Sequence, residues 1–235
     1  MTGHRSLAAR FARVVRGLDA GGSVLDRFCE AGQVMLDADG AAITVNYQRL
    51  SRHTVSATSP LALMIEDAQD VAGEGPGFDA ERSESVVCGA FGGIDLPPWP
   101  MLANSVAEIG FTGSILALPI LTAHQPLGVL VAHRRDTSWG FDDHVARFLC
   151  VSMGAALTEQ LTPEAIEDEL TDDWRLRSVV HQATGMVMSQ LRVRPEDAMV
   201  ILRAHAYSDG ASLIDVAWKV VDRELAFDDH SSEGS

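Results

Sequence analysis

The stretch Arg177–Gly185, Arg-Ser-Val-Val-His-Gln-Ala-Thr-Gly, opens a segment in which apolar residues recur every three or four positions. The stripe that runs through it consists of Leu176, Val180, Ala183, Val187 and Leu191. Residues at this spacing lie on one face of a single helix. The sequence therefore predicts a helix here, with an apolar face that packs against further helices.

Two more helices are predicted after this one. Arg194-Pro195-Glu196-Asp197 is a typical helix start, because proline is favoured at the first helical position and acids are favoured in the first turn. Asp209-Gly210 ends that helix, since glycine readily supplies the left-handed residue. Ser212 then begins the third helix as an N-cap, with Asp215 three positions later. The segment is predicted to be a small module of three helices.

The charge distribution limits how such a module could bind nucleic acid. The formal net charge of the chain is −15, which argues against a non-specific nucleic-acid binder because phosphate binding depends mainly on Lys and Arg. Trp174–Leu225 holds seven basic and six acidic residues, whereas Glu164–Asp173 is strongly acidic. Any nucleic acid bound by the module is therefore expected to be recognised by its shape and by a few contacts.

The first 160 residues predict an α+β domain in which helices pack on a sheet. The predicted helices are Ser6–Leu18, Val24–Leu36, Pro60–Val71, Met101–Ile109 and Asp142–Leu161. The predicted strands are Ala41–Tyr47, His53–Thr58, Val86–Gly89, Ser114–Leu121 and Leu127–His133. We expect this domain to occupy residues 1–161, a helical linker and the three-helix module to occupy 162–227, and an acidic disordered tail to occupy 228–235.

The loop sequence of the first domain resembles that of a GAF domain. The similarity rests on Gly73-Glu74-Gly75-Pro76-Gly77-Phe78-Asp79-Ala80, supported by Gly113–Leu118 and Leu127-Gly128-Val129-Leu130, and it covers about residues 20–160. It implies an antiparallel sheet flanked by helices that binds a small molecule, supports dimerisation, or does only the latter. A pocket would lie between the sheet and Leu96–Ile109, and no residue pattern names its ligand or upstream signal.

The C-terminal module resembles an ANTAR domain over about residues 165–225. The residues that carry the resemblance are Arg177, Val180, Gln182, Ala183, Gly185, Met188, Ala198, Leu202, Arg203, Ala206, Leu213, Val216, Ala217, Val220 and Val221. The resemblance implies an RNA-binding transcription antiterminator whose target is a pair of stem-loops with hexanucleotide loops. Binding would keep the terminator hairpin from forming. A GAF domain followed by an ANTAR domain is a known order in actinobacterial regulators, so the two resemblances support one another.

The resemblance also implies which residues bind the RNA loops. The expected set is Arg177, Gln182, Ala183, Thr184, Gly185, Met188, Arg203 and Tyr207. Gln182 can meet an adenine edge, Gly185 allows close approach of a backbone, and Arg203 can pair with a phosphate. Thr184 stands where the family commonly has Lys, which is expected to weaken the attraction for phosphate.

Five of these residues also have a purely structural alternative. Gln182, Ala183 and Gly185 could serve only to pack helices together. Arg203 could form a plain ion pair with a nearby acid, and Tyr207 could pack within the module.

The linker is predicted to pair two chains into a homodimer. Ile166, Leu170 and Trp174 are four residues apart and could form a seam between two helices. The alternative is that this stripe packs on its own domain. The acidic run Glu164–Asp173 could hold an arginine face in an inactive state or could be a solvated helix surface.

The remaining features bear on other classes of function. Three separated cysteines predict a reduced, cytoplasmic protein with no structural metal, and we expect no cofactor. No nucleophile has a base at a recognisable spacing, so an enzyme is not expected; the rival hypothesis is a GAF enzyme that reduces methionine sulfoxide with Cys88. The other rival is a signalling module whose last helices bind a protein partner. No apolar run reaches the roughly 18–20 residues of a membrane span.

Overall fold

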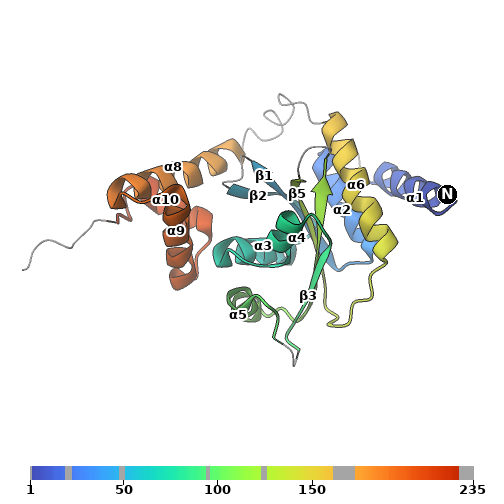
Figure 1. Cartoon of the computed structure of the whole chain (residues 1–235), viewed down its shortest axis with the longest axis horizontal. Helices are drawn as coiled ribbons and strands as arrows, with labels where there is room; N and C mark the ends of the chain where they lie inside the picture. The colour runs from blue at the N-terminus through green and yellow to red at the C-terminus, as the bar shows by residue number, and fades with distance from the viewer. Residues whose placement is uncertain are drawn as a thin grey trace, which may run out of the picture.

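The computed structural model describes residues 2–18, 23–47, 51–93, 96–122, 126–160 and 173–227. Figure 1 shows a sheet with helices on both faces and a separate group of C-terminal helices beyond α3. The helices are α1 (Thr2–Gly17), α2 (Val24–Leu36), α3 (Pro60–Ala72), α4 (Pro76–Ser83), α5 (Pro100–Glu108), α6 (Asp143–Gln160), α8 (Asp173–Leu191), α9 (Pro195–Asp209) and α10 (Leu213–Val221). The strands are β1 (Gly40–Tyr47), β2 (Ser51–Ala57), β3 (Val87–Phe91), β4 (Gly113–Leu121) and β5 (Pro126–Arg134).

The five strands form one antiparallel sheet in the order β2-β1-β5-β4-β3. Successive side chains of a strand point to opposite faces, and β4 shows this clearly. Leu116 and Leu118 join the buried cluster made with α2 and α6, whereas Ile115 and Ala117 join the cluster made with α3 and α5. Burial on both faces makes the sheet the centre of the first domain. The predicted α+β domain with an antiparallel, helix-flanked sheet is confirmed.

Helix α6 lies unusually close to the sheet at Gly154. A Cβ atom on Gly154 would overlap the main-chain carbonyl of Leu121 at the end of β4. The absence of a side chain lets the helix backbone approach the strand backbone directly. This contact fixes where α6, the last helix before the linker, leaves the sheet.

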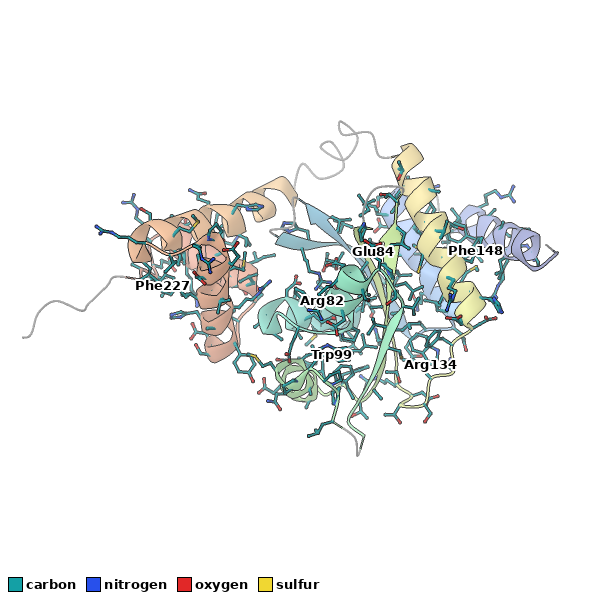
Figure 2. The ribbon with its side chains drawn as sticks, viewed as in Figure 1. Arg82, Glu84, Trp99, Arg134, Phe148 and Phe227 are labelled. Atoms are coloured by element: carbon teal, nitrogen blue, oxygen red, sulfur yellow. The ribbon has the colours of Figure 1, made fainter. Side chains whose placement is uncertain are left out.

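Large apolar side chains pack between α5 and the other face of the sheet. The region between the sheet and Leu96–Ile109, where the sequence suggested a ligand pocket, is filled by Phe91, Trp99, Leu102 and Phe111. The rings of Phe91 and Trp99 are stacked with their centroids 6.1 Å apart. Figure 2 labels Trp99 within this packing. A ligand pocket in this region stays a prediction.

The C-terminal helices form their own buried core. Its residues include Val180, Ala183, Val187, Leu202 and Val216. Gly210 ends α9 with φ 59°, and Ser212 caps α10 by accepting a 3.1 Å hydrogen bond from the Asp215 amide. The three-helix module is thus organised by the local signals that predicted it. None of the described helices combines the length and apolarity needed to cross a bilayer.

Candidate nucleic-acid interface

Helix α8 presents part of the predicted RNA surface to solvent. Gln182 and Gly185 are exposed, and Met188 is half-buried against the core of the module. A Cβ atom on Gly185 would have no neighbour within 4 Å. The backbone at Gly185 is therefore open to approach from outside, and no packing contact requires glycine there.

Ala183 and Thr184 lie on the inner side of the same helix. Ala183 is fully buried, and Thr184 is 8% exposed. The Thr184 hydroxyl donates a 2.7 Å hydrogen bond to the carbonyl of Val180 one turn earlier. The structure therefore places both residues in the packing of the three helices and away from the exposed surface of α8.

The start of α8 bears on the predicted dimer seam. Arg177 and Trp174 belong to this helix, but their side chains lie outside the described part of the structure. Ile166 and Leu170 lie outside the described residues. The pairing of two chains through this seam stays a prediction.

Arg203 does not face open solvent. Its Nε donates a 3.0 Å hydrogen bond to the main-chain carbonyl of Asp70, at the end of α3. Its guanidinium carbon lies 5.6 Å from the centroid of the Phe78 ring. Burial lowers the pKa of Arg203, while the charge of Asp70 opposes this effect. An acid, Asp70, thus lies near Arg203, but its main-chain carbonyl and not its carboxylate accepts the hydrogen bond from Arg203.

Tyr207 lies one turn after Arg203 on the same side of α9. It is 38% exposed. It lines a cavity of about 210 Å³ together with Met64 and Val71 of α3 and Ile109 after α5. Two of the predicted RNA contacts, Arg203 and Tyr207, therefore lie beside the first domain, whereas Gln182 and Gly185 are exposed on α8.

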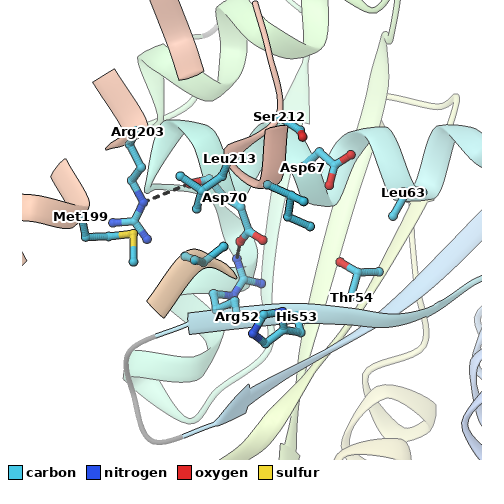
Figure 3. A pocket seen from close by; sticks show the side chains of 12 residues that line it. Arg52, His53, Thr54, Leu63, Asp67, Asp70, Met199, Arg203, Ser212 and Leu213 are labelled. Carbon is cyan, nitrogen blue, oxygen red and sulfur yellow. Dashed lines mark hydrogen bonds and ion pairs between the residues drawn. The ribbon is translucent and has the colours of Figure 1, made fainter. Parts of the chain in front are cut away.

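A larger cavity of about 330 Å³ separates the two domains (Figure 3). The first domain contributes Arg52, His53, Thr54, Leu63, Asp67 and Asp70, and the C-terminal helices contribute Val180, Met199, Arg203, Ser212, Leu213 and Ile214. Acidic groups crowd one wall. Burial, followed by the charges of Asp70 and Asp215, raises the pKa of Asp67 to about 6.

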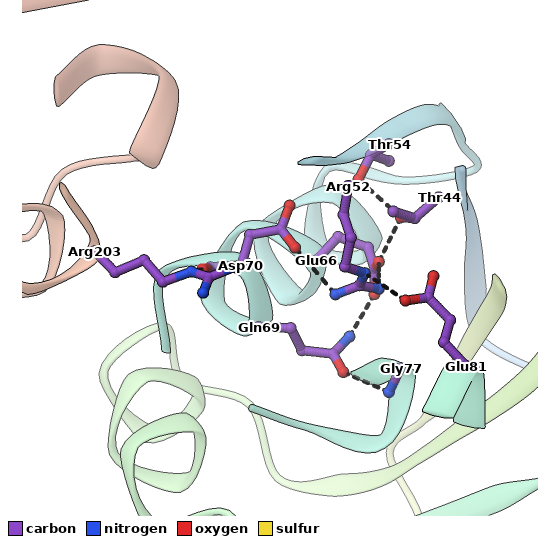
Figure 4. Close-up of polar contacts among 9 residues, drawn as sticks. All are labelled: Thr44, Arg52, Thr54, Glu66, Gln69, Asp70, Gly77, Glu81 and Arg203. Atoms are coloured by element: carbon purple, nitrogen blue, oxygen red, sulfur yellow. Dashed lines mark hydrogen bonds and ion pairs between the residues drawn. The ribbon is translucent and has the colours of Figure 1, made fainter. Parts of the chain in front are cut away.

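Behind this wall lies a buried arginine centre, which Figure 4 shows. The side chain of Arg52 is 5% exposed and contacts three carboxylates: Glu66 at 3.2 Å, Asp70 at 3.0 Å and Glu81 at 3.5 Å. Its guanidinium carbon also lies 4.2 Å from the centroid of the Phe78 ring. Burial alone lowers the pKa of Arg52, but these carboxylates outweigh burial and raise it. Burial raises the pKa of Glu66, and Arg52 opposes that shift.

The glycine-rich run after α3 is held by the same centre. The Gln69 amide donates to Glu66, and its oxygen accepts a 2.8 Å hydrogen bond from the Gly77 amide. Gly73 and Gly75 have φ values of 66° and 143°, which non-glycine residues rarely adopt. The sequence analysis identified this run but missed Arg52. The signal that could have found the centre is the pair Glu66 and Asp70, four residues apart on α3.

Cys88 bears on the redox hypothesis. Its side chain is exposed on β3, and desolvation raises the pKa of its thiol. A raised pKa reduces the fraction of reactive thiolate at neutral pH. The environment of Cys88 thus gives the enzyme hypothesis little support.

Comparison with known proteins identifies the C-terminal module. The family model of the ANTAR domain matches residues 168–221. No curated protein sequence matches the chain significantly.

Several solved structures are similar to part of this chain. A domain of a two-component sensor histidine kinase protein from Sinorhizobium meliloti 1021 is 16% identical, with a TM-score of 0.45, and the match covers 60% of this chain and 93% of that one. The GAF domain of an Acinetobacter phosphoenolpyruvate-protein phosphotransferase is 15% identical, with a TM-score of 0.43 and coverages of 65% and 92%. The corresponding GAF domain from Coxiella burnetii is 12% identical, with a TM-score of 0.45 and coverages of 66% and 95%. The chain carries an ANTAR domain at residues 168–221. It is preceded by the domain with a helix-flanked antiparallel sheet, whose loop sequence resembles that of a GAF domain and which is called the GAF-like domain below.

Proposed function

We propose that the protein is an RNA-binding transcription antiterminator whose activity is set by its GAF-like domain. The observation that carries this proposal is the ANTAR match over residues 168–221, most of which folds as the module α8–α10. The target is a pair of stem-loops with hexanucleotide loops in nascent RNA. Holding both loops would prevent the terminator hairpin from forming, so that polymerase reads through. This function places the protein in the cytoplasm.

The exposed side of α8 supplies suitable chemistry for an RNA loop. Unstacked bases in such loops are recognised by amides, by stacking and by close backbone contacts. Gln182 offers an exposed amide, and Gly185 leaves room for a sugar-phosphate chain. Arg203 and Tyr207 would add a phosphate contact and a stacking surface from α9.

Two loops require two modules, and we assign their pairing to a homodimer. The seam formed by Ile166, Leu170 and Trp174 would join the two chains just before α8. The distance between the modules would then depend on the helices that leave the GAF-like domain. Regulation could act by changing that distance or by changing access to the RNA surface of each module.

The test is a fluorescence polarisation titration with a dual hexaloop RNA and with the same RNA carrying scrambled loops. We expect loop-dependent binding by the full chain or by residues 164–235, and we expect Gln182→Ala to weaken it. Ser208→Ala, an exposed substitution at the end of α9, is the control. Equal binding of both RNAs, or no binding by either protein, would refute the RNA function. Absence of RNA binding would favour the rival in which the C-terminal helices bind a protein partner.

A further inference from the structure

We infer that this structure is an RNA-closed state, in which the GAF-like domain holds α9 against α3 and masks Arg203. The inference rests on the proposed RNA function and adds the means of its regulation. It predicts that opening the contact between the domains increases RNA affinity without any change in the ANTAR domain itself.

The first support is the state of Arg203. Its Nε is already used by the Asp70 carbonyl, and its guanidinium lies near the Phe78 ring. Strong recognition of a phosphate uses two parallel N–H donors of one guanidinium, approached from open solvent. An arginine that is half-buried against α3 cannot present that arrangement freely. Release of α9 from α3 would restore it.

The second support is apolar contact across the same boundary. Val71, in the last turn of α3, is 9% exposed. It belongs to the buried cluster of the C-terminal helices, together with Val180, Met199 and Ala206. One residue of the GAF-like domain thus completes the core of the ANTAR domain. Burial of this side chain favours the closed arrangement, because opening would return apolar surface to water.

The third support links the contact to the interior of the GAF-like domain. Asp70 uses its carboxylate to bind Arg52 and its main-chain carbonyl to bind Arg203, each at 3.0 Å. Phe78 of α4 contacts both guanidinium groups. A rearrangement of α4 or of the end of α3 would therefore change two sets of contacts together: those within the buried arginine centre, and those that Asp70 and Phe78 make with Arg203 of α9. This provides a physical route by which a signal in the first domain could reach the RNA surface.

The fourth support is that the boundary is imperfectly packed. A cavity of about 330 Å³ remains between the domains. Asp67 lines it without a hydrogen bond or ion pair to any other described residue, and the nearby acids Asp70 and Asp215 raise the pKa of its carboxyl further than burial alone. Protein interiors normally leave few voids and pair their buried charges. Such a contact suits reversible docking, as is usual for domains that move relative to one another.

The experiment opens the contact from the GAF-like side in the full chain, so that every residue of the ANTAR domain is retained. Val71→Asp places a charge in the apolar contact, and Val34→Asp, at a 50% exposed position on α2, is its control. Gly73→Ala is a milder second variant, because its Cβ would lie 3.3 Å from Cδ of Arg203. Gly110→Ala is its control, since Gly110 has a similar φ of 71° and no neighbour within 4 Å of a Cβ.

Each protein is measured by small-angle scattering, by circular dichroism and by titration with intact-loop and scrambled-loop RNA. We expect Val71→Asp to increase the radius of gyration, to keep its helicity and to bind the intact loops at least about fivefold more tightly, the lower end of typical coupling between sites. Gly73→Ala should also increase the radius of gyration and the affinity for the intact loops. Adding Arg203→Ala to Val71→Asp should remove the gain. If Val71→Asp loses its helicity, Gly73→Ala and its control decide the outcome.

The outcomes separate this inference from the proposed function. If the wild type binds intact loops and an opened variant binds them no more tightly, the closed-state inference is overturned and the RNA function stands. An opened variant that, like the wild type, does not distinguish intact from scrambled loops overturns both. A folded variant whose radius of gyration is unchanged overturns the claim that Val71 and Gly73 hold the domains together.

Discussion

Arg52 and Glu66 form an ion pair of 3.2 Å in which both side chains are almost completely removed from solvent, at 5% and 0% exposed. Glu66 also accepts hydrogen bonds from the Thr44 hydroxyl and the Gln69 amide. A buried ion pair need not stabilise a protein more than well-packed apolar residues in its place would. Removing one partner is nevertheless costly, because the other charge stays buried without compensation.

Arg52→Met should therefore destabilise the GAF-like domain by about 3–5 kcal/mol, since it leaves several carboxylates facing one another. The measurement is the free energy of unfolding in urea, followed by circular dichroism. Arg147→Met is the control, because Arg147 is 75% exposed and pairs with the exposed Asp143. Its effect should stay within about 0.5 kcal/mol. Equal losses for the two variants would show that the buried centre has no special role in stability.

Asp67 should make the stability of the protein depend on pH. The pKa of its carboxyl is raised from 3.8 to about 6 by burial and by the charges of Asp70 and Asp215. Groups from β2 and α9, including His53 and Arg203, line the same cavity. A raised pKa means that the folded state binds the proton more tightly than the unfolded state does. The resulting stabilisation is complete below about pH 4 and is lost as the pH rises through about 6.

Asp67→Asn should remove the loss of stability that accompanies ionisation of the carboxyl as the pH rises. At pH 7.5 the variant should be more stable than the wild type by an amount on the order of 1–2 kcal/mol, and the difference should disappear near pH 4. Urea denaturation at several pH values measures it. Glu30→Gln, an exposed substitution on α2, should leave the pH profile unchanged. An Asp67→Asn variant that is less stable at pH 7.5 would mean that the ionised carboxylate has a favourable partner.

Gly154 provides a case in which a close backbone contact should outweigh helix propensity. In an ordinary helix, replacing Gly by Ala stabilises by about 1 kcal/mol. Here the added Cβ would overlap the Leu121 carbonyl, and neither backbone can move easily. Gly154→Ala should therefore have a net cost of about 1–3 kcal/mol, as for other overpacked sites. A thermal melt measures it against Gly140→Ala, whose Cβ would have no neighbour within 4 Å.

The parts of this fold that the sequence predicted well are those with local causes. Helix α2 spans Val24–Leu36 as predicted, and Ser23 caps it by accepting a hydrogen bond from the Asp26 amide. The ends of α9 and α10 follow from Pro195, Gly210 and Ser212, which act within one turn of their own positions. Such signals can be recognised without knowledge of the rest of the chain.

The parts that were not predicted depend on contacts between distant residues. Arg203 and Asp70 are separated by 133 positions, so no local pattern indicates that they meet. Whether a pocket beside α5 is open depends on how Phe91, Trp99 and Phe111 pack together from separate segments. The prediction of the RNA surface was incomplete for the same reason. The helical spacing identified α8 and α9, but the contact of α9 with α3 could be found only in the structure.

Gly185 allows the role of the α8 surface in RNA binding to be tested separately from its role in the fold. Nothing within the protein would touch a Cβ at this position. Gly185→Ala should therefore stabilise the module by up to about 1 kcal/mol through helix propensity. The same methyl group should weaken binding to hexaloop RNA if a sugar-phosphate chain approaches the backbone there. Urea denaturation and a polarisation titration of the same preparation measure the two effects, and Ser208→Ala at the exposed end of α9 is the control. A more stable variant with undiminished RNA affinity would remove Gly185 from the interface, because no loss of folding could then conceal its contribution.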